Sequence, residues 1–107
     1  MKLKYKNKEI ELEECKSFYK RLKGFMFTKE INKALLFNKC SSIHTFFMKN
    51  NIDVILCNKE NKILYYYPNL KKNKVILPKK KVTKVYETPS NYFNIKINDT
   101  MEEIKWI

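Results

Sequence analysis

The sequence predicts an α+β domain in which a compact, mostly antiparallel sheet, barrel-like or sandwich-like, packs with one main helix near residues 14–23. The chain has 107 residues, enough for one hydrophobic core but too few for two, so a single domain over residues 1–107 is expected. Most apolar residues fall in short runs separated by turn residues, which is typical of strands. One segment alone spaces its apolar residues as a helix does.

The first fourteen residues are predicted to form a β-hairpin. Leu3 and Tyr5 are apolar at odd positions, whereas Ile10 and Leu12 are apolar at even positions. Because a strand cannot exchange its faces without a turn or a bulge, a turn is expected near residues 6–8. Asn7 is the residue there that best tolerates a left-handed backbone conformation.

The helix is predicted from four apolar residues at helical spacing i, i+3, i+4 and i+7. These residues are Cys15, Phe18, Tyr19 and Leu22. They define one helical face, which is expected to be apolar and to pack on the sheet. Gly24 stands where a helix that ends near Lys23 would place the residue after its last turn. Residues 25–27 then leave the helix as an apolar anchor for the core.

The middle of the chain is predicted to hold three strands. Residues 34–37 form an apolar run that is too short for a helix and typical of a buried strand. Residues 52–57 and 62–67 are joined by turn-forming residues and predict a second hairpin, which Pro68 is expected to end.

The last third of the chain is predicted to be more irregular. Residues 71–81 are rich in lysine and suggest a mobile, exposed loop, with residues 75–77 as an apolar anchor in its middle. A strand is expected over residues 82–86 and a turn at 89–91. A final strand over residues 102–107 would bring Trp106 to the core.

Composition narrows the classes of function only weakly. The net charge is +12 and the pI is about 9.6, which permits non-specific attraction to polyanions. The chain also has one glycine, one alanine and one arginine against abundant lysine, asparagine and isoleucine, a bias that an AT-rich genome explains. The charge is therefore weak support for nucleic-acid binding, whereas the lone Arg21 gains significance because its planar fork of donors differs from lysine.

The sequence predicts a cytoplasmic protein without a membrane span. No apolar run approaches the roughly 18 residues that cross a bilayer, and the charged N-terminus lacks the apolar core of a signal peptide. The three cysteines cannot all pair within one chain, and their spacing fits no disulfide framework, so free buried thiols are expected.

Four short motifs occur in order along residues 15–101. Residues 21–26 read Arg-Leu-Lys-Gly-Phe-Met, and residues 46–49 read Phe-Phe-Met-Lys before Ile-Asp-Val-Ile at 52–55. Residues 87–91 read Glu-Thr-Pro-Ser-Asn, and residues 98–99 read Asn-Asp. Together they resemble the signature of the "domain of unknown function 192" family.

The departures from that signature keep its chemistry. Phe25 replaces a leucine and remains apolar, while Asn91 and Asn98 replace glycines. Asparagine tolerates positive φ better than most residues, so the same turns can form. The resemblance implies a small β-rich domain with a short helix packed on it. It implies no activity, so no catalytic residue is carried over.

The polar residues of these motifs are the first candidates for a site. Asp53 interrupts an apolar strand and Glu87 follows another, so each carboxylate needs a partner. Arg21 can clamp a carboxylate through its fork. It either forms a structural pair that holds the helix to the sheet or stands in a cleft and binds an anionic ligand.

His44, the lone histidine, supports further hypotheses. Acid–base catalysis would pair it with Asp53 or Glu87. A zinc site would use Cys40 and His44 with Cys57 or Asp53, and a nucleophilic site would use one of these cysteines activated by His44. The chain lacks the glycines of a phosphate or oxyanion loop. No metal and no cofactor is predicted.

A lysine-rich segment suggests a third kind of site. No acidic residue occurs between Glu60 and Glu87, and Tyr65, Tyr66 and Tyr67 lie alongside. The candidate phosphate contacts are Lys71, Lys72, Lys74, Lys79, Lys80, Lys81 and Lys84. Lysines that hold phosphates beside tyrosines that stack on bases would give non-specific nucleic-acid binding.

The function predicted from these observations is a non-enzymatic binding or accessory module. Its groove for a small ligand or a protein partner is expected near His44, Asp53 and Arg21, with Glu87 as a fourth ligand-binding residue. The alternatives are a small enzyme that uses His44 with Asp53 or Glu87, and polyanion binding through residues 71–84.

Overall fold

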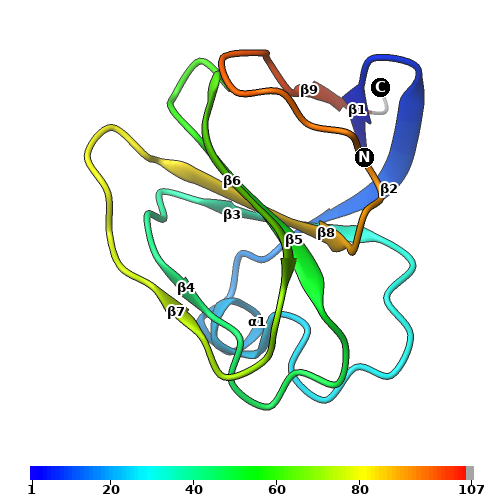
Figure 1. The fold of residues 1–107 in the computed structure, drawn as a ribbon, viewed down its shortest axis with the longest axis vertical. Helices are drawn as coiled ribbons and strands as arrows, with labels where there is room; N and C mark the ends of the chain where they lie inside the picture. The colour runs from blue at the N-terminus through cyan, green and yellow to red at the C-terminus, as the bar shows by residue number, and fades with distance from the viewer. Residues whose placement is uncertain (106–107) are drawn as a thin grey trace.

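A computed structural model of the chain describes residues 1–105. Its strands are β1 (Lys2–Tyr5), β2 (Lys8–Glu14), β3 (Ala34–Asn38), β4 (Ile43–His44), β5 (Ile52–Cys57), β6 (Ile63–Leu70), β7 (Val75–Ile76), β8 (Lys84–Pro89) and β9 (Glu102–Ile104). One helix, α1 (Phe18–Lys23), is present in this part of the chain. The β-rich α+β class is therefore confirmed (Figure 1).

The large sheet curls into a half-barrel. Its strand order is β6-β5-β8-β3-β2-β1-β9, and β4 pairs only with β7. Every neighbouring pair is antiparallel except β2 and β3, which are parallel and are connected through α1. A bridge between Lys62 and Thr100, with a hydrogen bond of 2.8 Å from the Ile63 N–H to the Asp99 carbonyl, joins the start of β6 to the segment before β9. These bonds bring the two ends of the sheet together, so the barrel-like form of the prediction applies.

The sheet has a hydrophobic cluster on each face. One cluster contains Ile55, Tyr86 and Met101. The other contains Val54, Leu56 and further residues on the side where α1 and the β4–β7 pair lie (Figure 1). Successive side chains of a strand point to opposite faces, and all six residues of β5 are buried because both faces of this central strand are covered.

The turn residues adopt the predicted backbone conformations with one exception. Asn91 and Asn98 have φ values of 60° and 78°, so asparagine does take the positive-φ conformation that the resemblance suggested. The first hairpin forms as expected, but Lys6 adopts positive φ (55°) in its turn while Asn7 does not. Gly24 ends α1 with φ 49° and ψ −124°, and its N–H donates to the Lys20 carbonyl over 2.9 Å.

Three predicted boundaries are wrong or shifted. β6 continues through Pro68 to Leu70, because it lies at the edge of the sheet, where a residue without an N–H donor is tolerated. α1 begins at Phe18, after Ser17 accepts a capping hydrogen bond from the Lys20 N–H over 3.1 Å. β8 begins at Lys84, two residues after the expected start. The expected final strand is present as β9, and Trp106 lies outside the described residues.

The predicted apolar face of α1 is only partly buried. Cys15, which precedes the helix, is 2% exposed, whereas Tyr19 and Leu22 are 69% and 54% exposed. A helix of six residues presents too little surface to bury a full stripe. The core contact on this side comes instead from Phe25, in the loop that follows the helix.

Candidate functional site

α1 places Arg21 against the end of β3. The guanidinium Nη1 atom of Arg21 donates a hydrogen bond of 2.8 Å to the main-chain carbonyl of Asn38. The predicted pair between Arg21 and a carboxylate is absent from the ion pairs of residues 1–105. The lone arginine thus holds the helix to the sheet through a backbone group and retains the other donors of its fork.

Glu87 lies on β8, directly beneath the end of α1. Its side chain is 3% exposed, and its Oε1 atom has no hydrogen-bond partner among the described residues. Burial raises the pKa of this carboxyl group from 4.5 to about 8, because water no longer stabilises the ionised form. At neutral pH the group is therefore mostly a protonated acid, able both to donate and to accept a hydrogen bond.

Gly24 allows the backbone after α1 to pass close to Glu87. A Cβ atom at this position would lie 3.3 Å from Oε1 of Glu87 and 3.5 Å from Cζ of Phe37. The positive φ of Gly24 also disfavours any residue with a side chain. The one glycine of the chain thus serves both the helix end and the floor of the site.

His44 reaches the same region from β4. Its Nδ1 atom accepts a hydrogen bond of 3.2 Å from the Phe46 N–H, and the two rings stack with centroids 5.2 Å apart. In the neutral ring this acceptor role leaves the proton on Nε2, so His44 offers a donor from its other side.

Arg21, His44 and Glu87 line one cavity of about 150 Å³. Other residues that line it include Lys23, Gly24, Phe37, Cys40 and Met48. We refer to it as the Glu87 cavity. Three of the four ligand-binding residues predicted from the sequence therefore converge, although they come from a helix and two strands that are far apart in sequence.

The structure does not bring Asp53 to this cavity. Asp53 pairs with Thr88 across β5 and β8, one residue out of phase with the Val54–Glu87 pair, so it faces the opposite side of the sheet. Its carboxylate accepts hydrogen bonds from the Tyr66 hydroxyl (3.0 Å) and from main-chain N–H groups of Asn69 (2.7 Å) and Asn91 (3.0 Å). The buried carboxylate is thus satisfied and fastens β6 and the turn after β8 to β5.

Two exposed phenylalanines, Phe27 and Phe47, stack on the surface. Phe27 and Phe47 are 59% and 62% exposed, and their rings stack with centroids 5.6 Å apart. The Phe27 N–H donates to the Phe47 carbonyl over 3.0 Å, which joins the loop after α1 to the loop after β4. Both residues have positive φ, 64° and 61°, which is unusual for bulky side chains.

The lysine-rich segment is tied to the rest of the fold at two places. Val75 and Ile76 form β7 and pair with β4, and Ile76 is buried, whereas Val75 and Leu77 are exposed, so the predicted anchor at residues 75–77 forms through Ile76 alone. The Thr45 hydroxyl donates to the Lys71 carbonyl over 2.7 Å and accepts from the Lys74 N–H. The ammonium group of Lys79 lies 5.1 Å from the centre of the Tyr65 ring. Polyanion binding by these lysines stays a prediction.

The residues predicted for a zinc site or a nucleophilic site do not all come together. Cys40 and His44 both line the Glu87 cavity, but Cys57 and Asp53 do not. Within residues 1–105 no three histidine, cysteine, aspartate or glutamate side chains gather as metal ligands. No helix in the same range is long and apolar enough to cross a membrane.

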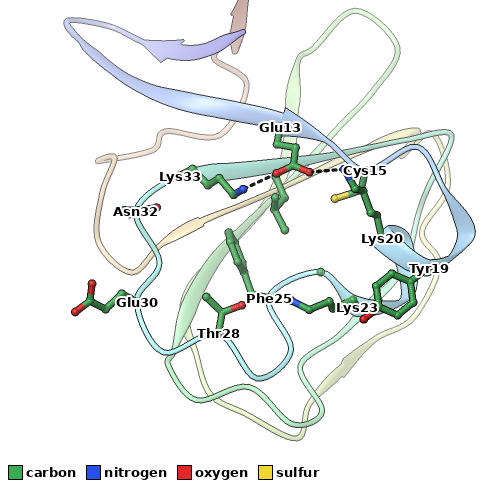
Figure 2. Close-up of a pocket in the computed structure, with 12 residues that line it drawn as sticks. Glu13, Cys15, Tyr19, Lys20, Lys23, Phe25, Thr28, Glu30, Asn32 and Lys33 are labelled. Carbon is green, nitrogen blue, oxygen red and sulfur yellow. Dashed lines mark hydrogen bonds and ion pairs between the residues drawn. The ribbon is translucent and has the colours of Figure 1, made fainter.

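Sequence reasoning missed a larger pocket on the other side of Gly24. Its volume is about 430 Å³, and it lies between the end of β2, α1 and the segment before β3 (Figure 2). We refer to it as the α1–β2 pocket; it is lined by Glu13, Cys15, Tyr19, Lys23 and further residues. No motif marks it, because its charged residues are lysines and glutamates in a lysine-rich chain. Only the parallel pairing of β2 with β3 brings them together.

Comparisons with known proteins agree on the family and the fold. The family model for domain of unknown function 192, described as "Uncharacterized ACR", matches residues 1–102. A UPF0127 protein of Thermococcus sibiricus is 34% identical over 102 residues, covering 84% of this chain and 62% of the relative. A UPF0127 protein of Thermococcus kodakarensis is 34% identical over 79 residues, covering 68% of this chain and 50% of the relative. The chain thus spans about half to three fifths of the length of these relatives.

Two solved structures share the fold at 14% sequence identity. A Novosphingobium aromaticivorans protein of unknown function superposes with a TM-score of 0.79, covering 95% of this chain and 82% of that protein. A Sinorhizobium meliloti protein described as a candidate transcription regulator superposes with a TM-score of 0.78, covering 94% and 89%. At this identity the likeness concerns the fold alone. The family match over residues 1–102 is the stronger finding, and by it the chain belongs to the domain of unknown function 192 family, whose function is not established.

Proposed function

We propose that this protein is a non-enzymatic binding module whose Glu87 cavity holds a small anion, with a carboxylate as the best chemical match. One observation carries the proposal: Oε1 of the buried Glu87 has no hydrogen-bond partner among the described residues, and Glu87 lines a cavity. An unsatisfied buried polar atom costs about 1–3 kcal/mol. A ligand that completes this hydrogen bond would recover that free energy.

The charges around the cavity favour an anion. Arg21 and Lys23 line it, and neither of them forms an ion pair within residues 1–105. Glu87 adds little negative charge at pH 7, because burial raises its pKa to about 8. The free donors of the Arg21 fork match the two oxygens of a carboxylate, and the protonated Glu87 can donate a further hydrogen bond.

The size of the cavity limits the ligand to a few atoms. A volume of 150 Å³ is roughly five times the 30 Å³ that one water molecule occupies in the liquid. Acetate, with four non-hydrogen atoms, fits this limit. At a ceiling of about 1.5 kcal/mol per atom, its dissociation constant would be tens of micromolar at best.

The test is an NMR titration at pH 7 with acetate, and with acetamide as its neutral counterpart. Gly24 lines the cavity and is the one glycine of the chain, so its amide signal is an unambiguous reporter. We expect acetate to shift this signal saturably and acetamide to have little effect. Replacing Arg21 with lysine should weaken acetate binding about fivefold or more, because the bidentate fork is lost.

The matched control is Lys16→Gln, which removes an exposed positive charge near α1 that does not line the cavity. Because Arg21→Lys keeps the positive charge, weakening of acetate binding by Lys16→Gln but not by Arg21→Lys would mean that acetate senses only the general positive charge. A lower melting temperature of Arg21→Lys with unchanged acetate binding would leave Arg21 a purely structural role and overturn the proposal.

The rival function is a small enzyme that uses His44 in acid–base catalysis. The pair with Asp53 has no geometric support, since Asp53 faces the opposite side of the sheet. The pair with Glu87 shares a cavity but has no direct hydrogen bond among the described residues. Binding of an unreactive anion requires neither pair, so the arrangement of these residues supports anion binding better than acid–base catalysis.

A further inference from the structure

The α1–β2 pocket has the size and the floor of a site for an organic molecule. Its volume of about 430 Å³ falls within the roughly 300–1,000 Å³ typical of small-molecule sites. Cys15, Phe25 and Leu35 line it and are at most 3% exposed, so its floor is apolar. Tyr19, which is 69% exposed, lines it from α1. Apolar side chains cannot solvate an inorganic ion, whereas they would shield a hydrocarbon or aromatic group from water.

The charged groups of this pocket are not all paired. Figure 2 shows Glu13 between Lys33 and Lys20, with the Lys20–Glu13 contact at 3.0 Å. These two lysines hold the pKa of Glu13 below its usual value, with Lys33 contributing more. Glu13 therefore remains ionised and occupies both ammonium groups.

Lys23 lines the pocket from the end of α1 and has no ion-pair partner within residues 1–105. The remaining carboxylate that lines the pocket, Glu30, is exposed. Three lysines thus face two glutamates around the pocket, an excess of one positive charge. The uncompensated cation is adjacent to the apolar floor.

We propose that the α1–β2 pocket binds an amphipathic organic anion, with its apolar body against Phe25 and Leu35 and its acidic group toward Lys23. This site is distinct from the Glu87 cavity, although Lys23 and Gly24 line both. Binding is non-covalent, because the thiol of Cys15 is buried and its pKa is raised to about 11, mainly by burial. Such a thiol is a poor nucleophile at neutral pH.

The test uses three probes with one aromatic body and different charge: 1-naphthoate, 1-naphthamide and 1-naphthylmethylammonium. Binding is followed by NMR through the amide signals of Thr28 and Leu35, which line this pocket but not the Glu87 cavity. We expect naphthoate to bind most tightly and the ammonium probe most weakly. Replacing Lys23 with glutamine should weaken naphthoate about three- to tenfold, as for a partly shielded ion pair, and leave naphthamide unchanged.

Two further variants sharpen the result. Lys16→Gln is the matched control and should leave naphthoate binding unchanged, since Lys16 does not line this pocket. Glu13→Gln should strengthen naphthoate binding, because Lys20 and Lys33 lose their carboxylate partner. Arg21→Lys should have no effect here, so failure of this site is distinguishable from failure of the Glu87 cavity. Equal affinity for naphthoate and naphthamide, or equal weakening by Lys23→Gln and Lys16→Gln, would overturn the proposal.

Discussion

Glu87 is a buried acid whose protonation is coupled to folding. Its pKa is raised from 4.5 to about 8 by burial, so between these values the unfolded chain loses a proton that the folded protein retains. The unfolded state therefore binds fewer protons in this window, and the free energy of unfolding falls as pH rises through it. Below pH 4.5 and above pH 8 this residue adds no pH dependence.

Replacing Glu87 with glutamine should remove this pH dependence. We expect the variant to lose less stability than the original protein between pH 5 and pH 8, by up to about 4 kcal/mol, because this window covers three pH units of the shift from 4.5 to about 8. Urea unfolding at both pH values measures the difference for each protein. Parallel curves for the two proteins would show that Glu87 is not protonated when buried.

The roles of some residues can be predicted from the sequence and those of others cannot. Asp53 and Glu87 are both carboxylates in apolar strands, and nothing in the sequence separates their roles. The register of β5 against β8 does so, by placing them on opposite faces of the sheet. Gly24, by contrast, was predictable, because a helix end at positive φ requires glycine whatever surrounds it.

At the scale of elements, β5 depends on Asp53 to hold its neighbours. The carboxylate fastens β6 through Asn69 and the turn after β8 through Asn91. Both of these asparagine residues have positive φ, so the carboxylate stabilises backbone conformations that the chain would otherwise adopt less readily.

Replacing Asp53 with asparagine should therefore cost about 2–3 kcal/mol of unfolding free energy, because charge-assisted hydrogen bonds weaken and an amide group meets donors. Thermal or urea unfolding measures this loss. Asp99→Asn is the matched control: its carboxylate accepts one side-chain bond, from the Tyr5 hydroxyl over 2.6 Å, so a smaller loss is expected. A loss for Asp53→Asn no larger than that of the control would contradict the structural role of Asp53.

The elements also differ in how well the sequence predicts them. The β5–β6 hairpin was predictable because two apolar runs flank a strong turn. The exposure of Tyr19 and Leu22 was not, because helical spacing identifies a face but not whether six residues suffice to bury it. The pairing of β4 with β7 was missed because two strands of two residues each carry no periodicity.

At the scale of the whole molecule, the two faces of the large sheet carry different features. One face holds the apolar cluster that contains Ile55 and Tyr86, and Asp53 lies on that same face. The opposite face carries α1, the Glu87 cavity and the α1–β2 pocket, all near Gly24. Sequence patterns predicted the fold class and three residues of the Glu87 cavity. The α1–β2 pocket depends on long-range strand pairing and left no local pattern.

The most direct measurement of the central claim is the pH dependence of acetate binding at the Gly24 amide, compared between the original protein and Glu87→Gln. We predict that acetate binding to the original protein weakens at least about tenfold between pH 7 and pH 9, because Glu87 ionises near pH 8 and repels the ligand within the cavity. The Glu87→Gln variant should bind acetate at both pH values with nearly equal affinity. Loss of binding between pH 7 and pH 9 in both proteins, or in neither, would contradict the account that places the anion beside Glu87.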